Sequence, residues 1–194
     1  FMNRIQKLMP LCLTSLAGGA KDNAIPRSCQ ATLVAMGIHL ERINAIAEEL
    51  QAEVRQTYNE PEATVQAFDV DALGGNGLTT ESTAKIIALL CATPNSVQSW
   101  SQDIEGLVQT SLNLGVARLE EELKLTFAVR SSVNREKREL LDRLKELADF
   151  YEGSYSEVGA YPAWEYKKDS RLRDTMVEIF TRMFGKAPEV VPTH

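Results

Sequence analysis

Two runs of alternating apolar and polar residues constrain the fold of this 194-residue chain more than any other feature. The first run extends from Val108 to Val116, the second from Leu123 to Arg130, and the acidic connection Glu120–Glu122 lies between them. Side chains of a strand alternate between the two faces of a sheet, so each run predicts a strand with an apolar and a polar face. Two such strands with a short polar connection predict an antiparallel hairpin with one buried and one open face.

The alternation also assigns side chains to the faces of this hairpin. Arg130 is expected on the open face, at the end of the second strand. The apolar face is expected to carry Val108, Leu112, Leu114 and Val116 from the first strand and Leu123, Leu125, Phe127 and Val129 from the second.

Helices are predicted where apolar residues recur at a spacing of three or four and where a capping residue or a proline marks an end. Thr79 or Thr80 and Ser170 are the predicted N-terminal caps, and Gly185 is the predicted stop of the last helix. The predicted helices are Asn3–Met9, Glu41–Tyr58, a helix from Thr79 or Thr80 to Thr93, Asn134–Tyr151 and a helix after Ser170.

Further strands are predicted where short apolar segments lie between turn-forming residues. These segments are Leu11–Leu16, Cys29–Met36, Thr64–Val70, Tyr155–Ala160 and Pro188–Pro192. Strands and helices are interleaved, which predicts an α+β fold: antiparallel sheet with helices packed on one face, built as two adjoining sheet-plus-helix units. The expected division is 1–100 and 101–194, although no internal repeat supports a duplication.

Composition excludes several classes of protein. There are 21 Lys and Arg against 27 Asp and Glu, and the net charge of −6 argues against a nucleic-acid-binding surface. The uncharged run Leu8–Ala20 is too short and too interrupted to cross a membrane, so a cytoplasmic protein is expected. Three cysteines without CxxC spacing (Cys12, Cys29 and Cys91) indicate neither a disulfide framework nor a zinc site, and they are expected to be buried and inert.

Two polar residues are candidates for ligand binding. Arg130 precedes Ser131 at a predicted helix N-terminus, and a guanidinium near unpaired backbone N–H groups could bind a carboxylate. The alternative is a surface ion-pair partner, which is the commoner role of an arginine at a strand edge. Asn23 is in a predicted loop, where it is either a ligand contact or a turn former.

The remaining candidates have plainer interpretations. Gly18–Gly19 is a turn or a place where another chain segment approaches closely. Gly74–Gly77 lacks the Gly-Lys-Ser/Thr of a phosphate loop and is interpreted as a turn, and His39 as a solvated or capping residue. No nucleophile, base or pair of carboxylates suggests an independent hydrolase.

Four ordered blocks of sequence resemble the lid domain of the aminoacyl-histidine dipeptidases, which are di-zinc metallopeptidases related to carboxypeptidase G. The first block is the glycine pair followed by Asn23-Ala24-Ile25-Pro26-Arg27. The others are Gln109–Gly115 with Val129–Ser132, then Gly159–Trp164, and finally Phe184–Lys186 with the closing segment. Together they extend over nearly the whole chain.

The resemblance implies roles for two residues and for a metal. Such enzymes hold two zinc ions in a separate catalytic domain and hydrolyse dipeptides with a C-terminal histidine, carnosine among them. Their lid closes over the substrate, and its Asn and Arg, which match Asn23 and Arg130, bind the substrate carboxylate or polarise the scissile carbonyl. The family's zinc-ligand blocks have no counterpart here, so no catalytic residue, no bound zinc and no metal role for His194 are expected in this chain.

The sequence therefore predicts that 1–194 is the lid, or substrate-capping and dimerising, domain of a cytoplasmic dipeptidase, excised from a longer protein and inactive alone. The expected partners are the dipeptide, the enzyme's own catalytic domain and a second copy in a homodimer, with neither nucleic acid nor membrane. The alternative is a stand-alone α+β binding or dimerisation module without peptidase activity.

Overall fold

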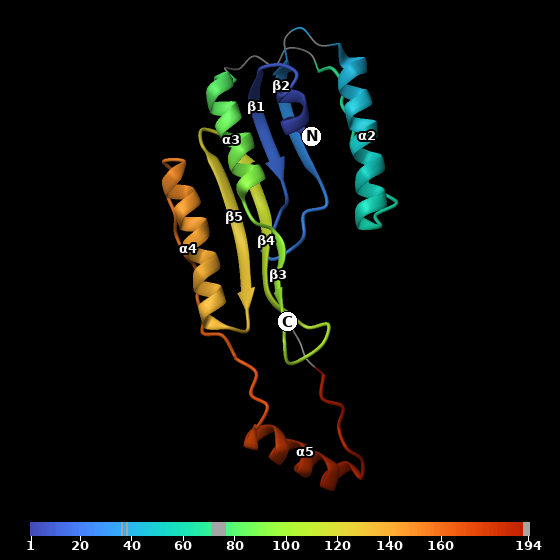
Figure 1. Cartoon of the computed structure of the whole chain (residues 1–194), viewed down its shortest axis with the longest axis vertical. Coiled ribbons are helices and arrows are strands. Elements are labelled where there is room, and N and C mark those ends of the chain that lie inside the picture. Colours follow the sequence, from blue (N-terminus) through green and yellow to red (C-terminus); the bar gives the residue numbers. More distant parts are fainter. Residues whose placement is uncertain (36, 38, 71–76, 192–194) are drawn as a thin grey trace. The chain divides into compact units, whose positions relative to one another are not determined.

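The structure is a computed structural model that describes residues 1–35, 37, 39–70 and 77–191 (Figure 1). Its strands form an antiparallel sheet in which β1 pairs with β2 and β4, and β4 pairs also with β3 and β5. The predicted α+β fold is confirmed. The elements in chain order are α1 (Met2–Gln6), β1 (Leu11–Gly18), β2 (Cys29–Ala35), α2 (Leu40–Tyr58), α3 (Thr80–Ala92), β3 (Ser96–Trp100), β4 (Val108–Leu119), β5 (Leu123–Ser131), α4 (Asn134–Phe150) and α5 (Arg171–Phe184).

Contacts are densest within two compact units. Unit 1 is Phe1–Thr93 with Leu114–Phe127, and unit 2 is Pro94–Asn113 with Ala128–His194. Because β4 and β5 each contribute to both units, neither unit is a single stretch of chain. The division of the sequence into 1–100 and 101–194 stays a prediction.

The core of unit 1 lies where β1 meets the first three helices. Leu13, in the middle of β1, has no solvent-exposed surface, and Ile5 of α1 and Ile87 of α3 are almost as fully buried. Figure 1 shows α3 beside β1, with which it makes extensive contact. The Thr83 hydroxyl of α3 is also buried and accepts a hydrogen bond from Leu13 N at 2.9 Å, so a backbone donor in this apolar core keeps its partner.

The helices form where the sequence predicts them. Thr79 caps α3 by accepting a hydrogen bond from Ser82 N at 3.1 Å, and Ser170 caps α5 by accepting one from Arg173 N at 3.3 Å. Gly185 ends α5 at φ 71°, a left-handed angle that glycine adopts without steric cost. Apolar residues at helical spacing and capping side chains therefore located these helices correctly.

The predicted strand Thr64–Val70 is wrong. None of its residues is part of the sheet, because this segment bonds to side chains of α2 instead. Val65 N donates to Gln51 Oε1 at 3.0 Å, and Arg55 Nε donates to Ala63 O at 2.8 Å.

The predicted strand Tyr155–Ala160 is wrong for the same reason. The Arg138 guanidinium of α4 forms an ion pair with Glu157 at 2.7 Å, and the Tyr155 hydroxyl donates to the same carboxylate at 3.0 Å. Residues 188–191 of the predicted strand Pro188–Pro192 are not in a strand either, and Pro192 lies outside the described residues. The predicted turn at Gly74-Gly75-Asn76 and residue His194 also lie outside them.

The β4–β5 hairpin is confirmed, but its faces differ in part from the prediction. On β5 the apolar residues from Leu123 to Val129 are half-buried and Arg130 is exposed, as expected. In the part of β4 that belongs to unit 1, the buried residues are Gly115, Ala117 and Leu119, whereas Leu114 and Val116 are only half-buried. The apolar pattern of Leu114 and Val116 therefore assigned the wrong face to this half of the strand.

The strand β3 is not predicted by the sequence. Its residues are mostly exposed and include Ser96, Gln98 and Ser99, so no apolar alternation marks it. It is an antiparallel partner of β4, with Ser96 opposite Leu112 and Trp100 opposite Val108. Among the described helices, none is long and apolar enough to cross a membrane.

Candidate functional site

The loop that carries Asn23 connects β1 to β2 and is exposed to solvent along most of its length. Gly19 N donates to Ser28 O at 3.3 Å, which closes the loop at its base. Asn23 N donates to the Asp22 carboxylate at 2.8 Å, a local bond typical of a turn. The Asn23 side-chain amide bonds to no residue that the structure describes, so its donors face solvent.

Two glycines allow this loop to cross β4 at very short range. A Cβ placed on Gly115 would lie 2.5 Å from Asp22 Cα, and a Cβ placed on Gly19 would lie 2.9 Å from the Gly115 carbonyl carbon. Gly19 also has φ +69°, which L side chains rarely adopt. Of the two interpretations of Gly18–Gly19, the close approach of another chain segment is therefore confirmed.

A long-range hydrogen bond strengthens this crossing. Arg118 Nη2 of β4 donates to Gly19 O at 3.0 Å, across 99 positions of sequence. At the loop's other end the Cys29 thiol packs against Gly18, since a Cβ on Gly18 would lie 3.0 Å from the sulfur.

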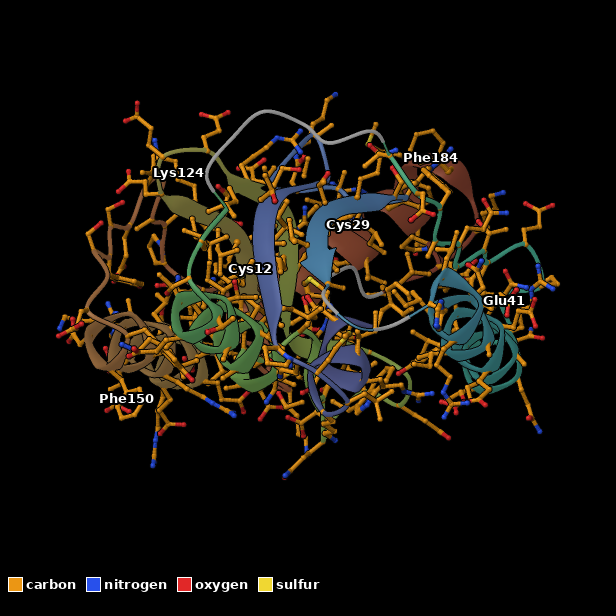
Figure 2. The ribbon with its side chains drawn as sticks, turned by 90° about the horizontal axis from the view of Figure 1, so that it is seen from above. Cys12, Cys29, Glu41, Lys124, Phe150 and Phe184 are labelled. Atoms are coloured by element: carbon orange, nitrogen blue, oxygen red, sulfur yellow. The ribbon has the colours of Figure 1, made fainter. Side chains whose placement is uncertain are left out.

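The cysteines do not match the expectation that all three are buried. Cys29 and Cys91 are exposed, and Cys12 is half-buried; Figure 2 shows Cys12 and Cys29 on the neighbouring strands β1 and β2. Local burial of the Cys29 sulfur still raises the pKa of this thiol above its ordinary value, against the opposing effect of Arg118. Cys29 is therefore a protonated, weakly nucleophilic thiol at neutral pH.

Arg130 lies on β5 in unit 2 and is exposed. The preceding and following residues of a strand point to the opposite face, and on that face the Ser131 hydroxyl lies 2.8 Å from the Thr110 hydroxyl of β4. Within the described part of the chain, no side chain or backbone group bonds to the Arg130 guanidinium. This open-face position agrees with the sequence prediction, and the surface ion pair offered as its alternative is not formed with any described residue.

The sequence predicts unpaired backbone N–H groups beside Arg130, at the start of α4. This prediction is wrong for Val133 and Asn134, whose N–H groups both have acceptors. Val133 N donates to Ser131 Oγ at 3.0 Å, and Asn134 N donates to Glu165 Oε1 at 3.3 Å. Asn134 Oδ1 in turn accepts from Ala163 N at 2.9 Å, so the start of α4 is closed by the 163–165 segment. Any anion bound by Arg130 would depend on the guanidinium rather than on these helix N–H groups.

A polar network holds the start of α4 against β3 and β4. The Glu136 carboxylate accepts hydrogen bonds from the Ser99 hydroxyl at 2.5 Å, from Gln109 Nε2 at 2.6 Å and from the Thr110 hydroxyl. Thr110 is only 2% exposed and also lies beside the Ser131 hydroxyl. The network thus connects one carboxylate to three residues that are 26 to 37 positions away in sequence.

Electrostatics keep Glu136 ionised. Desolvation by burial acts to raise its pKa, but the hydrogen bonds from Ser99, Thr110 and Gln109 together lower the pKa below the ordinary value of 4.5. Glu136 is not among the site residues predicted from the sequence, because the helix carboxylates were expected on solvent-exposed faces. The one available signal was the position of Glu136 in the first turn of a helix that follows two serines.

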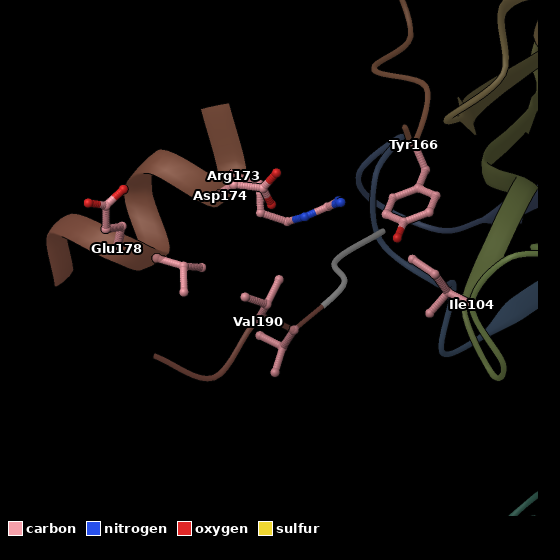
Figure 3. A pocket seen from close by; sticks show the side chains of 8 residues that line it. Ile104, Tyr166, Arg173, Asp174, Glu178 and Val190 are labelled. Carbon is pink, nitrogen blue, oxygen red and sulfur yellow. The ribbon is translucent and has the colours of Figure 1, made fainter. Parts of the chain in front are cut away.

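Unit 2 also contains an open hollow of about 730 Å³ (Figure 3). Among its described lining residues the one cation, Arg173, already donates to the Lys167 and Lys168 carbonyl oxygens and lies 5.3 Å from the Tyr166 ring centroid. These described residues therefore offer apolar surface but no free positive charge for an anionic ligand. Its lining residues are Ile104, Tyr166, Arg173, Asp174, Val177, Glu178, Val190 and Val191.

Metal ligation was tested on the described residues, where no three His, Cys, Asp or Glu side chains are placed to hold a metal ion. His39 is exposed and precedes α2 without forming a side-chain cap, which agrees with a solvated histidine. Asn23 belongs to unit 1 and Arg130 to unit 2. Their convergence on one ligand stays a prediction.

Comparison with known proteins finds similar proteins, although no family model matches the chain. The sequence is 28% identical over 189 residues, or 96% of this chain, to the cytosol non-specific dipeptidase of Escherichia coli strain K12. The structure is similar to the crystal structure of aminoacylhistidine dipeptidase from Vibrio alginolyticus, with a TM-score of 0.80 and 26% identity over 94% of this chain. The chain spans 39% and 38% of the lengths of these two proteins.

Both relatives confirm the resemblance to dipeptidases found in the sequence. The similarity extends over nearly the whole chain in sequence and in structure, and it covers about two fifths of each relative. This chain is therefore homologous to a segment of the dipeptidases that these two proteins represent.

Proposed function

We propose that this chain is the lid domain of a cytoplasmic metallodipeptidase that hydrolyses Xaa-His dipeptides such as carnosine. The homology to a segment of dipeptidases supports the reaction class, and the name of the Vibrio relative supports the histidine preference. The observation that carries the proposal is the state of Arg130: a guanidinium on the open face of a strand, exposed and without a partner among the described residues.

Arg130 supplies the charge that a dipeptide's C-terminal carboxylate requires. The planar guanidinium can donate two parallel hydrogen bonds to one carboxylate, and such charge-assisted bonds are about twice as strong as neutral ones. Because Arg130 forms no ion pair with a described residue, a carboxylate can bind the guanidinium by replacing water alone. The contact would orient the C-terminal residue of the substrate.

Asn23 supplies neutral N–H donors from a separate loop. Its amide can donate to the same carboxylate or to the scissile carbonyl oxygen, where negative charge develops as the peptide bond is attacked. Donors that are already fixed in place stabilise that charge without a reorganisation cost. The bonds of the Gly19–Ser28 loop base and of Asp22 hold the backbone that carries the Asn23 amide.

The chemical step itself is assigned to the remaining part of the enzyme. The resemblance implies two zinc ions in a separate catalytic domain, and the described residues of this chain do not provide a cluster that fits a metal. This chain would bind the substrate's C-terminal end and cover it, and exclusion of water would strengthen each polar contact. Its partners would be the dipeptide, the catalytic domain and a second copy in a homodimer.

Arg130→Ala is expected to lower kcat/KM for a Xaa-His dipeptide roughly 10- to 150-fold in the full-length enzyme, because one charge-assisted contact is worth about 1.5–3 kcal/mol. Steady-state kinetics with carnosine measure the effect. For a dipeptide whose C-terminus is a carboxamide, Arg130→Ala should lower kcat/KM much less, since this substrate lacks the charge that Arg130 binds.

Lys124→Ala is the matched control for this experiment. Lys124 is an exposed cation on the same strand and is expected on the same face as Arg130, but it already lies 3.5 Å from Glu122. Its removal should leave kcat/KM within about twofold of the wild-type value. Wild-type kinetics for Arg130→Ala would refute the proposed carboxylate site.

A further inference from the structure

The crossing of the Asn23 loop over β4 leaves no room for a side chain at position 115, and we infer that Gly115 is a positioning residue for Asn23. This inference rests on the proposed role of Asn23 in binding the dipeptide. Gly115 itself touches no substrate in this scheme. It acts through the backbone of Asp22, the residue directly before Asn23.

A side chain at position 115 would collide with the backbone of Asp22. A Cβ on Gly115 would lie 2.5 Å from both the carbonyl carbon and the Cα of Asp22, and nearer still to its carbonyl oxygen. Real Cβ atoms essentially never approach another heavy atom within 3.0 Å. The obstacle is backbone, which cannot rotate away like the end of a flexible side chain. An alanine at this position must therefore push the Asp22 backbone off β4.

The position of Gly115 within the strand supports the same conclusion. Glycine in a strand interior weakens the strand and often marks a close approach by another backbone. Gly115 lies in the interior of the twelve-residue strand β4, flanked by Leu114 and Val116. Here the approaching backbone is the loop that carries Asn23.

The loop is anchored at its base, and Asn23 is joined to Asp22 at its tip. Two hydrogen bonds hold the ends of the loop: Gly19 N donates to Ser28 O, and Arg118 Nη2 donates to Gly19 O. Both bonds lie at the base of the loop and not at Asp22 or Asn23. At the tip, Asn23 N bonds to the Asp22 carboxylate, so Asn23 moves together with Asp22. A shift of the Asp22 backbone is thus passed directly to the Asn23 amide.

The test compares three variants made in the full-length enzyme, labelled with 15N and in a metal-free form, so that carnosine binds without being hydrolysed. Gly115→Ala introduces the clash. Gly153→Ala is the matched control, because its Cβ would lie 3.4 Å from the nearest atom, Ala148 O, at an ordinary contact distance. Leu119→Ala is the stability control, because it removes a buried side chain from the same strand without adding an atom near the loop.

Two readouts are recorded for each variant: the backbone and side-chain amide signals of Asn23, and their change on titration with carnosine. Gly115→Ala is expected to shift the Asn23 signals and to weaken carnosine binding at least tenfold. Gly153→Ala and Leu119→Ala should keep wild-type Asn23 signals and wild-type affinity, although Leu119→Ala lowers the melting temperature. A purely structural role for Gly115 would make its variant resemble Leu119→Ala.

The outcomes separate the inference from the proposed function. Unchanged Asn23 signals and affinity in Gly115→Ala overturn the positioning role, while a carnosine response in the wild-type chain leaves the function of Asn23 standing. If the wild-type Asn23 signals do not respond to carnosine, the binding role of Asn23 is overturned. Displaced signals in Gly115→Ala would then still show that this glycine sets the place of Asn23.

Discussion

Leu13→Ala is expected to lower the free energy of unfolding by about 2–5 kcal/mol, the range for removing the branched end of a leucine from a core that cannot fully collapse. Leu13 has no exposed surface and packs with Leu16, Ala117 and Leu119. Its backbone is fixed on both sides, since its N–H bonds to the Thr83 hydroxyl and its C=O accepts from Leu78 N. Little movement is therefore available to fill the cavity.

Urea denaturation followed by circular dichroism measures this loss of stability. Leu8→Ala is the matched control, because Leu8 is the same residue type but is 54% exposed, and its variant should stay within about 0.5 kcal/mol of wild type. Leu13→Met keeps the volume and should cost less than about 1.5 kcal/mol. Equal stability of Leu13→Ala and Leu8→Ala would contradict the assigned core.

Glu136→Ala is expected to destabilise the chain by about 3 kcal/mol at pH 7. The substitution leaves the donors of Ser99, Gln109 and Thr110 without their shared acceptor, and each lost acceptor at a buried or half-buried donor costs about 1 kcal/mol or more. Glu139→Ala, three positions along the same helix, removes an exposed carboxylate that pairs with Arg135. It should cost less than about 1 kcal/mol.

The same network predicts a dependence on pH. The pKa of Glu136 is lowered in the folded chain, so the unfolded chain binds more protons and the stability from this carboxylate is present above its ordinary pKa of 4.5. It is lost as the pH falls through the lower folded-state value. The difference in stability between wild type and Glu136→Gln should therefore be full at pH 7 and shrink below pH 4.5. A difference that stays constant from pH 7 to pH 3 would exclude an ionised Glu136.

Local sequence was sufficient to predict a helix wherever neighbouring side chains cap its ends. The helix α3 begins at the Thr79 cap, and α5 lies between the Ser170 cap and Gly185, all of which are readable from neighbouring residues. Local sequence was insufficient where apolar composition predicted a strand but a backbone N–H group bonds to a helix side chain instead of to a neighbouring strand. Val65 bonds to Gln51 of α2 in this way, and the distinction depends on which element folds back beside the segment.

The candidate site divides in the same manner. The exposed position of Arg130 on β5 follows from the alternation of a single strand, and the motif containing Asn23 is visible in consecutive residues. The packing that holds these elements in place cannot be predicted from neighbouring residues. Glu136 acquires its partners from β3 and β4, and β3 has no apolar alternation by which it could be recognised.

By itself the sequence determined the α+β class, the helices of the described residues, the β4–β5 hairpin and the relationship to dipeptidases, because short-range spacing and ordered motifs carry that information. Only the tertiary structure decided that Gly19 and Gly115 meet and that Glu136 is held by Ser99, Gln109 and Thr110. The physical reason is that steric fit and the partners of a buried carboxylate depend on residues distant in sequence, which become neighbours only when the strands pair.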